Sequence, residues 1–173
     1  MQISLYDVTV ASYTQALEGL ANVLERGRTH LEANHADLQQ IVDRRLIADM
    51  QPFAYQVNAV THHSVGALAG LASGSFSPPA PLPVLTYADL QDRIAQARET
   101  LAGHTPEQVN AWQDRDVTFS VGSRSIPFRA PQFILSFSLP NLYFHATTAY
   151  DILRMEGVPI GKRDYSGTMR IKS

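Results

Sequence analysis

The chain has 173 residues, with 14 basic and 16 acidic side chains, six histidines and no cysteine. Without cysteine there is no disulfide framework, no thiolate nucleophile and no zinc site built on sulfur. Charged residues make up 17% of the sequence, below the figure of about 25% for an average soluble domain. The net charge of −2 provides no field that would attract nucleic acid or anionic lipid. The length predicts one domain, residues 1–173.

No apolar run approaches the ~18 residues that a transmembrane helix needs. The N-terminal residues 1–7 lack the basic segment followed by an apolar one that marks a signal peptide. We therefore expect a soluble cytoplasmic protein that binds neither membrane nor nucleic acid.

Apolar residues spaced three and four apart predict a first helix from about Leu5 to Leu31. Ser4, with Asp7 three residues later, is typical of a capped helix start. A short second helical piece is expected over residues 38–46.

A longer helix is expected to begin after Asp49, which would cap it, with Pro52 in the first turn. Its apolar stripe runs on until Gly74, which ends it. Residues 74–85 contain four prolines and predict an extended connector.

Thr86 and Asp89 form a capping box ahead of a helix that reaches Gly103. Residues 105–107, Thr-Pro-Glu, indicate a further, brief helix. Alternating apolar residues on both sides of Gly122-Ser123 predict a β-hairpin over residues 117–128.

The last helix is expected over Pro131 to Glu156. Pro140 lies inside it and should kink or split it, because proline lacks the backbone N–H. The tail, residues 158–173, is basic and is predicted to be irregular. These elements predict an all-α, antiparallel four-helix bundle with a small β-hairpin before the last helix.

Histidine is the residue through which chemistry is most expected, because it titrates near neutrality and ligates zinc and nickel. His62 and His63 are adjacent on the long second helix, so only one of them can face inward. Helical phase favours His63, which lies one turn from Val60 and Ala67, and leaves His62 as the alternate. A boundary histidine bonded to water or to a carbonyl is the other interpretation.

His145 shares a stripe of the last helix with Asn141 and Thr148. One interpretation is a satisfied polar cluster that fixes the helix kink. The other is the polar floor of a small-ligand pocket between helices, lined by these three residues with Gln56 and Tyr143. Phosphate-loop, nucleophile-elbow and His-Glu-x-x-His motifs are absent from the sequence.

The last helix carries a recognisable motif, PNLYFHATTAYDILR at 140–154, followed by GVPIGKRDY at 157–165. Together with SLYD at 4–7 and RLIADMQP at 45–52, it resembles an uncharacterised bacterial and fungal domain family within the DinB/YfiT-like superfamily of metalloenzymes. The resemblance implies an up-down-down-up four-helix bundle that is commonly dimeric.

The resemblance also implies a divalent metal, zinc or nickel, held in complete members by three histidines. One stands on the second helix and two stand four residues apart on the last. His63, or His62, matches the first position and His145 one of the pair. Its partner positions hold Ala149 and Asn141, so the triad is incomplete.

Three functions follow as hypotheses. The first is a small-ligand-binding or structural bundle with a degenerate metal site. The alternative is a metal-dependent transferase or hydrolase that uses His63 and His145 with a metal-bound water. The third, nucleic-acid binding, is disfavoured by the balanced charge. We also expect a homodimer formed through the first and last helices.

Overall fold

The computed structural model describes residues 3–172, so the outermost ends of the predicted domain lie outside it. Within this range the chain is mostly helical and carries one small sheet. The helical elements are η1 (Asp7–Ala11), α1 (Ser12–Ala33), α2 (Leu38–Val42), α3 (Phe53–Thr61), η2 (His62–Gly66), α4 (Ala67–Ser73), α5 (Tyr87–Ala102), α6 (Pro106–Asn110), α7 (Ala130–Phe133), η3 (Ile134–Ser138), α8 (Leu139–Met155) and α9 (Lys162–Tyr165). The three elements labelled η are π-helical turns.

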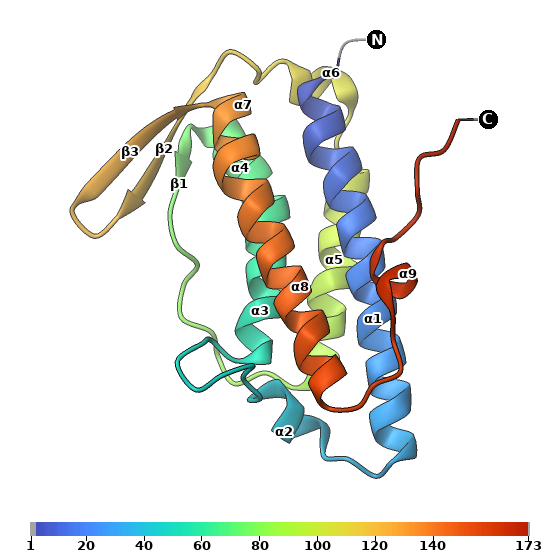
Figure 1. Ribbon diagram of the computed structural model, residues 1–173. Coiled ribbons are helices and arrows are strands. Elements are labelled where there is room, and N and C mark those ends of the chain that lie inside the picture. The colour runs from blue at the N-terminus through green and yellow to red at the C-terminus, as the bar shows by residue number, and fades with distance from the viewer. Residues whose placement is uncertain (1–2, 173) are drawn as a thin grey trace.

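Four long helical stretches lie side by side (Figure 1). They are η1–α1, α3–η2–α4, α5 and α7–η3–α8. In Figure 1, α1 and α8 run from top to bottom, whereas α3–α4 and α5 run the opposite way. Both α1 and α3 pack against α5 and α8.

The capped helix starts predicted at Ser4, Thr86 and Thr105 are confirmed. Asp7 accepts a hydrogen bond from the backbone N–H of Ser4, and the Ser4 hydroxyl accepts one from the backbone N–H of Asp7. Thr86 and Asp89 form the capping box of α5, and the brief α6 has its own box at Thr105. These signals are local pairs of residues three apart, so the surrounding fold does not change them.

The predicted cap at Asp49 is wrong, because α3 begins at Phe53 with Pro52 at its N-cap. A residue that precedes proline is driven out of the α region, so the helix cannot begin upstream of Pro52. The short helix before it also ends earlier than predicted, at Val42.

Pro140 does not split the last helix. It lies at the start of α8, directly after the π-turn η3, and the chain stays helical from Ala130 to Met155. A π-turn places one extra residue in the helix, and the irregularity expected at the proline therefore takes this form.

The hairpin is confirmed as β2 (Asp116–Val121) and β3 (Arg124–Arg129), joined at Gly122-Ser123. A third strand, β1 (Ser75–Phe76), was not predicted; it lies inside the predicted connector and pairs in parallel with β2. The predicted irregular tail contains one helical turn, α9.

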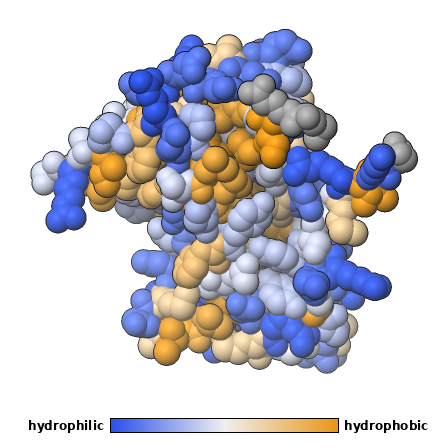
Figure 2. Space-filling view, turned by 45° about the horizontal axis from the view of Figure 1, so that its top comes forward, coloured by the Kyte–Doolittle hydropathy of each residue, from blue (hydrophilic) through white to orange (hydrophobic). Residues whose placement is uncertain are grey.

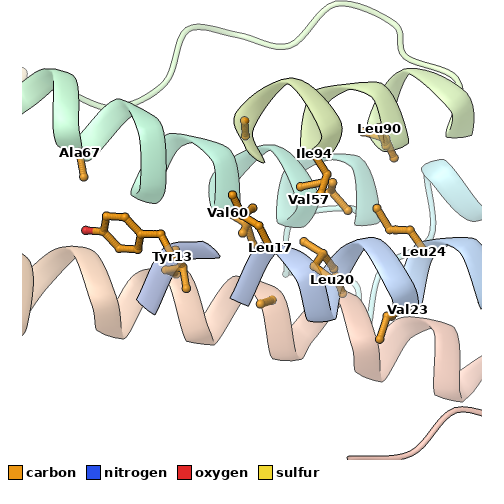
Figure 3. Packing of buried hydrophobic residues seen from close by; sticks show 14 of the residues in the cluster. Tyr13, Leu17, Leu20, Val23, Leu24, Val57, Val60, Ala67, Leu90 and Ile94 are labelled. Atoms are coloured by element: carbon orange, nitrogen blue, oxygen red, sulfur yellow. The ribbon is translucent and has the colours of Figure 1, made fainter. Parts of the chain in front are cut away.

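The core is a continuous cluster of buried apolar side chains contributed by all four stretches. Figure 3 shows Leu17, Leu20 and Leu24 of α1 directed toward α3 and α5. The opposing side chains in that view are Val57, Val60, Leu90 and Ile94. Burial of this cluster positions the α3–η2 stretch against α8; η2 carries His62 and His63, and α8 carries His145.

Candidate functional site

The π-turn η2 carries both histidines of the second helical stretch. The rings of His62 and His63 meet edge to face with their centroids 5.3 Å apart, and both rings approach Phe76 of β1. His63 is only 7% exposed, as helical phase predicted for the inward residue. His62 is half-buried beneath the connector that follows β1.

His145 of α8 lies against His63, with nearly parallel rings whose centroids are 5.9 Å apart. Its Nδ1 lies 2.7 Å from Oε1 of Gln56, a side chain that is only 1% exposed. Gln56 Nε2 donates to the carbonyl of Gln51 at 2.9 Å. Because the amide oxygen is an acceptor, His145 donates from Nδ1, and its Nε2 remains an unprotonated acceptor.

Two imidazole nitrogens in this cluster are buried and have no hydrogen-bond partner within the described range. They are Nδ1 of His63 and Nε2 of His62. A buried polar atom without a partner costs free energy, so these two nitrogens are unusual within the apolar surroundings supplied by Phe76 and Phe137.

All three imidazoles are neutral at physiological pH. Burial lowers the pKa of His63 to about 3, and the positive charges that His62 and His145 would carry lower it further. Burial also lowers the pKa of His145, to about 4, and that of His62. Groups with such low pKa values are poor general bases near pH 7, so the cluster is better suited to hydrogen bonding than to proton transfer.

A buried hydrogen-bonded chain, which the sequence analysis missed, joins three helical stretches at this cluster. Ser138 Oγ donates to the carbonyl oxygen of His63 at 2.6 Å, and Tyr13 Oη lies 2.8 Å from Ser138 Oγ. Burial raises the pKa of Tyr13, so its hydroxyl stays protonated. Ser138 ends one π-turn and His63 lies in another. The only sequence signal was the presence of polar hydroxyls in apolar helix stripes.

The five residues predicted to line one pocket are spread over different places. Gln56 and His145 come together. Asn141 and Thr148 turn back to their own helix and donate to the carbonyls of Phe137 and Phe144, at 2.7 and 2.8 Å. Tyr143 is 44% exposed and lines a separate hollow beside α1 and Tyr165.

The histidine cluster does not fit the three-histidine metal site that the resemblance implies. Ala149, one turn after His145, is buried and offers no ligand atom, and the amide of Asn141, one turn before it, is engaged with Phe137. Across residues 3–172 no group of three or more histidine or acidic side chains is placed to hold a metal ion.

His62 also lines a pocket of about 510 Å³, which we call the proline pocket. Its walls are α3–η2, α5 and the connector, and its lining residues are Asn58, Thr61, His62, Val65, Gly66, Arg93 and residues 78–83. Arg93 Nη1 donates to Oδ1 of Asn58 at 3.1 Å. No sequence pattern predicts this pocket, because its polar residues are separated by the 74–85 connector and meet only in the fold.

None of the helices in the described range combines the length and the hydrophobicity that crossing a bilayer requires. The chain matches the family model for a domain of unknown function, DUF1993, over residues 5–166. It is also similar to the crystal structure of a DinB family member from Shewanella denitrificans. The two are 28% identical, with a TM-score of 0.80 over 98% of this chain and 95% of the other.

No curated protein matches this sequence. The resemblance carried by the C-terminal motif is nevertheless confirmed, since the family model spans nearly the whole chain and the structural relative is a DinB family member. The chain belongs to the DUF1993 family, a domain of unknown function with a DinB-like fold.

Proposed function

We propose that this protein is a small-molecule-binding DinB-like four-helix bundle in which the superfamily's metal site has become degenerate. The observation that carries the proposal is the proline pocket, which adjoins a histidine cluster whose side chains, within the described residues, are not placed to hold a metal ion. Its volume of about 510 Å³ falls in the range of about 300–1,000 Å³ typical of ligand sites. Its lining combines apolar side chains with a few polar groups, which is the composition such sites have.

A structural role for the histidine cluster is supported by its contacts. His145 is anchored to Gln56, and His63 packs between aromatic rings of β1 and η3. Replacement of the expected third ligand by Ala149 removes what a zinc site needs, since such sites use at least three protein ligands. The cluster then serves to fix α3 against α8 beside the proline pocket.

Two measurements test the proposal. Protein purified without chelator or added metal should contain less than about a tenth of an equivalent of zinc or nickel, because no three ligands in the described range are placed together for these ions. A thermal-shift screen of small organic molecules should give hits that are lost when Gly66, in the wall of the pocket, is replaced by Trp. One equivalent of metal per chain would overturn the proposal, and so would a screen without any hit.

A metal-dependent transferase or hydrolase is the second candidate, and one observation favours it. The hydrogen bond from His145 Nδ1 to Gln56 leaves Nε2 unprotonated, which is the arrangement seen in metal-ligating histidines. If this candidate is right, His145→Ala abolishes zinc uptake while the helical circular dichroism is retained. Uptake that is the same in wild type and variant would reject it.

A further inference from the structure

We propose that the proline pocket recognises a small organic acid, whose carboxylate binds Arg93 and whose apolar body packs against the connector. This inference rests on the proposed function and assigns it a class of ligand. It follows from the charge, the hydrogen bonds and the shape of the pocket.

Arg93 is a cation whose charge acts on Asp89 only at a distance, where, after the hydrogen bonds from Thr86, it helps to lower the pKa of that carboxyl. No acidic side chain in residues 3–172 forms a salt bridge with it. Asp89, one turn earlier on α5, is committed to the capping box, where its Oδ2 accepts from the backbone N–H and the hydroxyl of Thr86. Arg93 is half-buried, and the guanidinium donors that Asn58 does not engage are available at the pocket.

Asn58 holds the guanidinium in place. Its side chain is only 7% exposed, and its Oδ1 accepts from Nη1 of Arg93. A guanidinium has five N–H donors in a rigid fork, so one neutral acceptor fixes its orientation and leaves an edge for a carboxylate. Paired N–H donors on a planar carboxylate give one of the strongest hydrogen-bonding arrangements in proteins.

The remaining lining explains why the ligand carries a single acidic group and an apolar body. Four prolines of the connector, at positions 78, 79, 81 and 83, present rings and have no backbone N–H. Leu82 and Val65 add apolar surface, and the hydroxyl of Thr61 donates to the carbonyl of Asn58. His62 is neutral at physiological pH, so Arg93 supplies the positive charge. A phosphate carries more oxygens and more charge than the single guanidinium can match.

Matched pairs of compounds test the proposal. Binding of hexanoate, phenylacetate and 3-phenylpropionate would be compared by titration calorimetry with binding of the corresponding primary amides and with inorganic phosphate. At least one acid should bind about tenfold or more tightly than its amide, the factor expected when a hydrogen-bonded charge is lost. Backbone NMR shifts of Val65 and Gly66 should report the binding, whereas those of Tyr143 should not.

Arg93→Gln should weaken the acid by a similar factor and leave amide binding unchanged. Arg98→Gln, on the exposed side of the same helix, is the control and should bind like wild type. Because Arg93→Gln also alters the contact with Asn58, Arg93→Lys is added, which keeps the charge and loses the planar fork. It should give intermediate affinity. Circular dichroism verifies that each variant is folded.

The outcomes separate this inference from the function on which it rests. If amides bind as tightly as acids, if phosphate binds most tightly, or if Arg93→Gln binds acids like wild type, the carboxylate assignment is overturned while small-molecule binding stands. If neither the acids nor the amides change the NMR shifts of Val65 or Gly66, both the carboxylate assignment and the proposed function are overturned.

Discussion

Ser138 Oγ donates a 2.6 Å hydrogen bond to the carbonyl oxygen of His63 across the interface between η3 and η2. The same hydroxyl oxygen is 2.8 Å from Tyr13 Oη. Ser138, Tyr13 and Ser64 beside them are fully buried, so this polar contact lies in the middle of an apolar bundle. It connects the first, second and last helical stretches at the level of the histidine cluster.

Ser138→Ala should destabilise the fold by about 1–3 kcal/mol, because it leaves a buried carbonyl and the buried Tyr13 hydroxyl without their partner. Tyr13→Phe should cost less, since Ser138 keeps its bond to His63. Urea denaturation measures both. Ser136→Ala, two residues away on the exposed side of η3, is the control. Equal destabilisation by Ser136→Ala and Ser138→Ala would contradict a role for the buried chain.

The free energy of unfolding should fall as the pH is lowered from about 6.5 toward 4. The pKa values of His63 and His145, about 3 and about 4, lie below the value of 6.5 for free histidine. The unfolded chain therefore binds more protons in this range, and each histidine contributes a loss of up to about 1.4 kcal/mol per pH unit. The dependence is half-developed at pH 6.5, where the unfolded histidines are half-protonated, and it vanishes above about pH 7.5.

Carboxylates also titrate at low pH, so this effect is measured as a difference between variants. His63→Gln should reduce the slope of unfolding free energy against pH between 6.5 and 4.5. His35→Asn is the control, because His35 is exposed and has a φ of 56°, which asparagine tolerates. An unchanged slope in His63→Gln would show that His63 is not held neutral by burial.

Sequence patterns predicted the elements whose cause is local. The capping pairs at Ser4 and Thr86, and the hairpin turn at Gly122, depend on residues within a few positions of one another. Strand β1 depends instead on pairing between residues 75–76 and residues 118–119. A two-residue strand has no period of its own, and the prolines after it indicated only a connector.

The candidate site was predictable only where helical phase decides the outcome. Phase identified the buried His63, and the structure brings Gln56 and His145 together as the proposed lining required. Helical phase could not place Tyr143, because the π-turn η3 changes the rotation of α8 relative to a regular helix. The pairing of Arg93 with Asn58 needs the packing of α5 on α3, which no spacing in the sequence encodes.

Gly19→Ala should detach the segment after α8 from α1. A Cβ at Gly19 would lie 1.8 Å from the carbonyl oxygen of Tyr165, far inside contact distance, and the backbone there has to move. Hydrogen exchange should therefore accelerate at Ser166, whose N–H is bonded to the carbonyl of Lys162. Gly103→Ala is the control, since its Cβ would meet only Thr100 at an ordinary 3.4 Å. Equal exchange in both variants would contradict the prediction.

One part of the predicted homodimer interface, on the first helix, is covered by the C-terminal segment of the same chain. Figure 1 shows the C-terminal segment running along α1. Gln15 donates to the carbonyl of Ser166, and Asn22 donates to that of Asp164. This part of α1 is therefore occupied by the chain itself, which leaves α8 as the more accessible of the two predicted helices.

The outer side of α7–η3–α8 remains apolar enough for such a contact. Leu135, Tyr143 and Phe144 of this stretch are 56%, 44% and 55% exposed, and we take these exposed apolar side chains as the candidate interface. Figure 2 shows hydrophobic surface near the centre of one face of the molecule, below a largely hydrophilic upper rim, and further hydrophobic patches along the lower edge.

We therefore predict a dimer in which α8 meets α8 of a second copy, detected by light scattering at micromolar concentration. Phe144→Glu should shift it to the monomer, because two carboxylates would be brought into one apolar interface. Val84→Glu, at a side chain that is 95% exposed on the connector, should leave the mass unchanged. A monomeric mass for the wild type would rule out the dimer. A dimer that survives Phe144→Glu would exclude α8 as its interface, because a buried unpaired charge there costs more than the contact supplies.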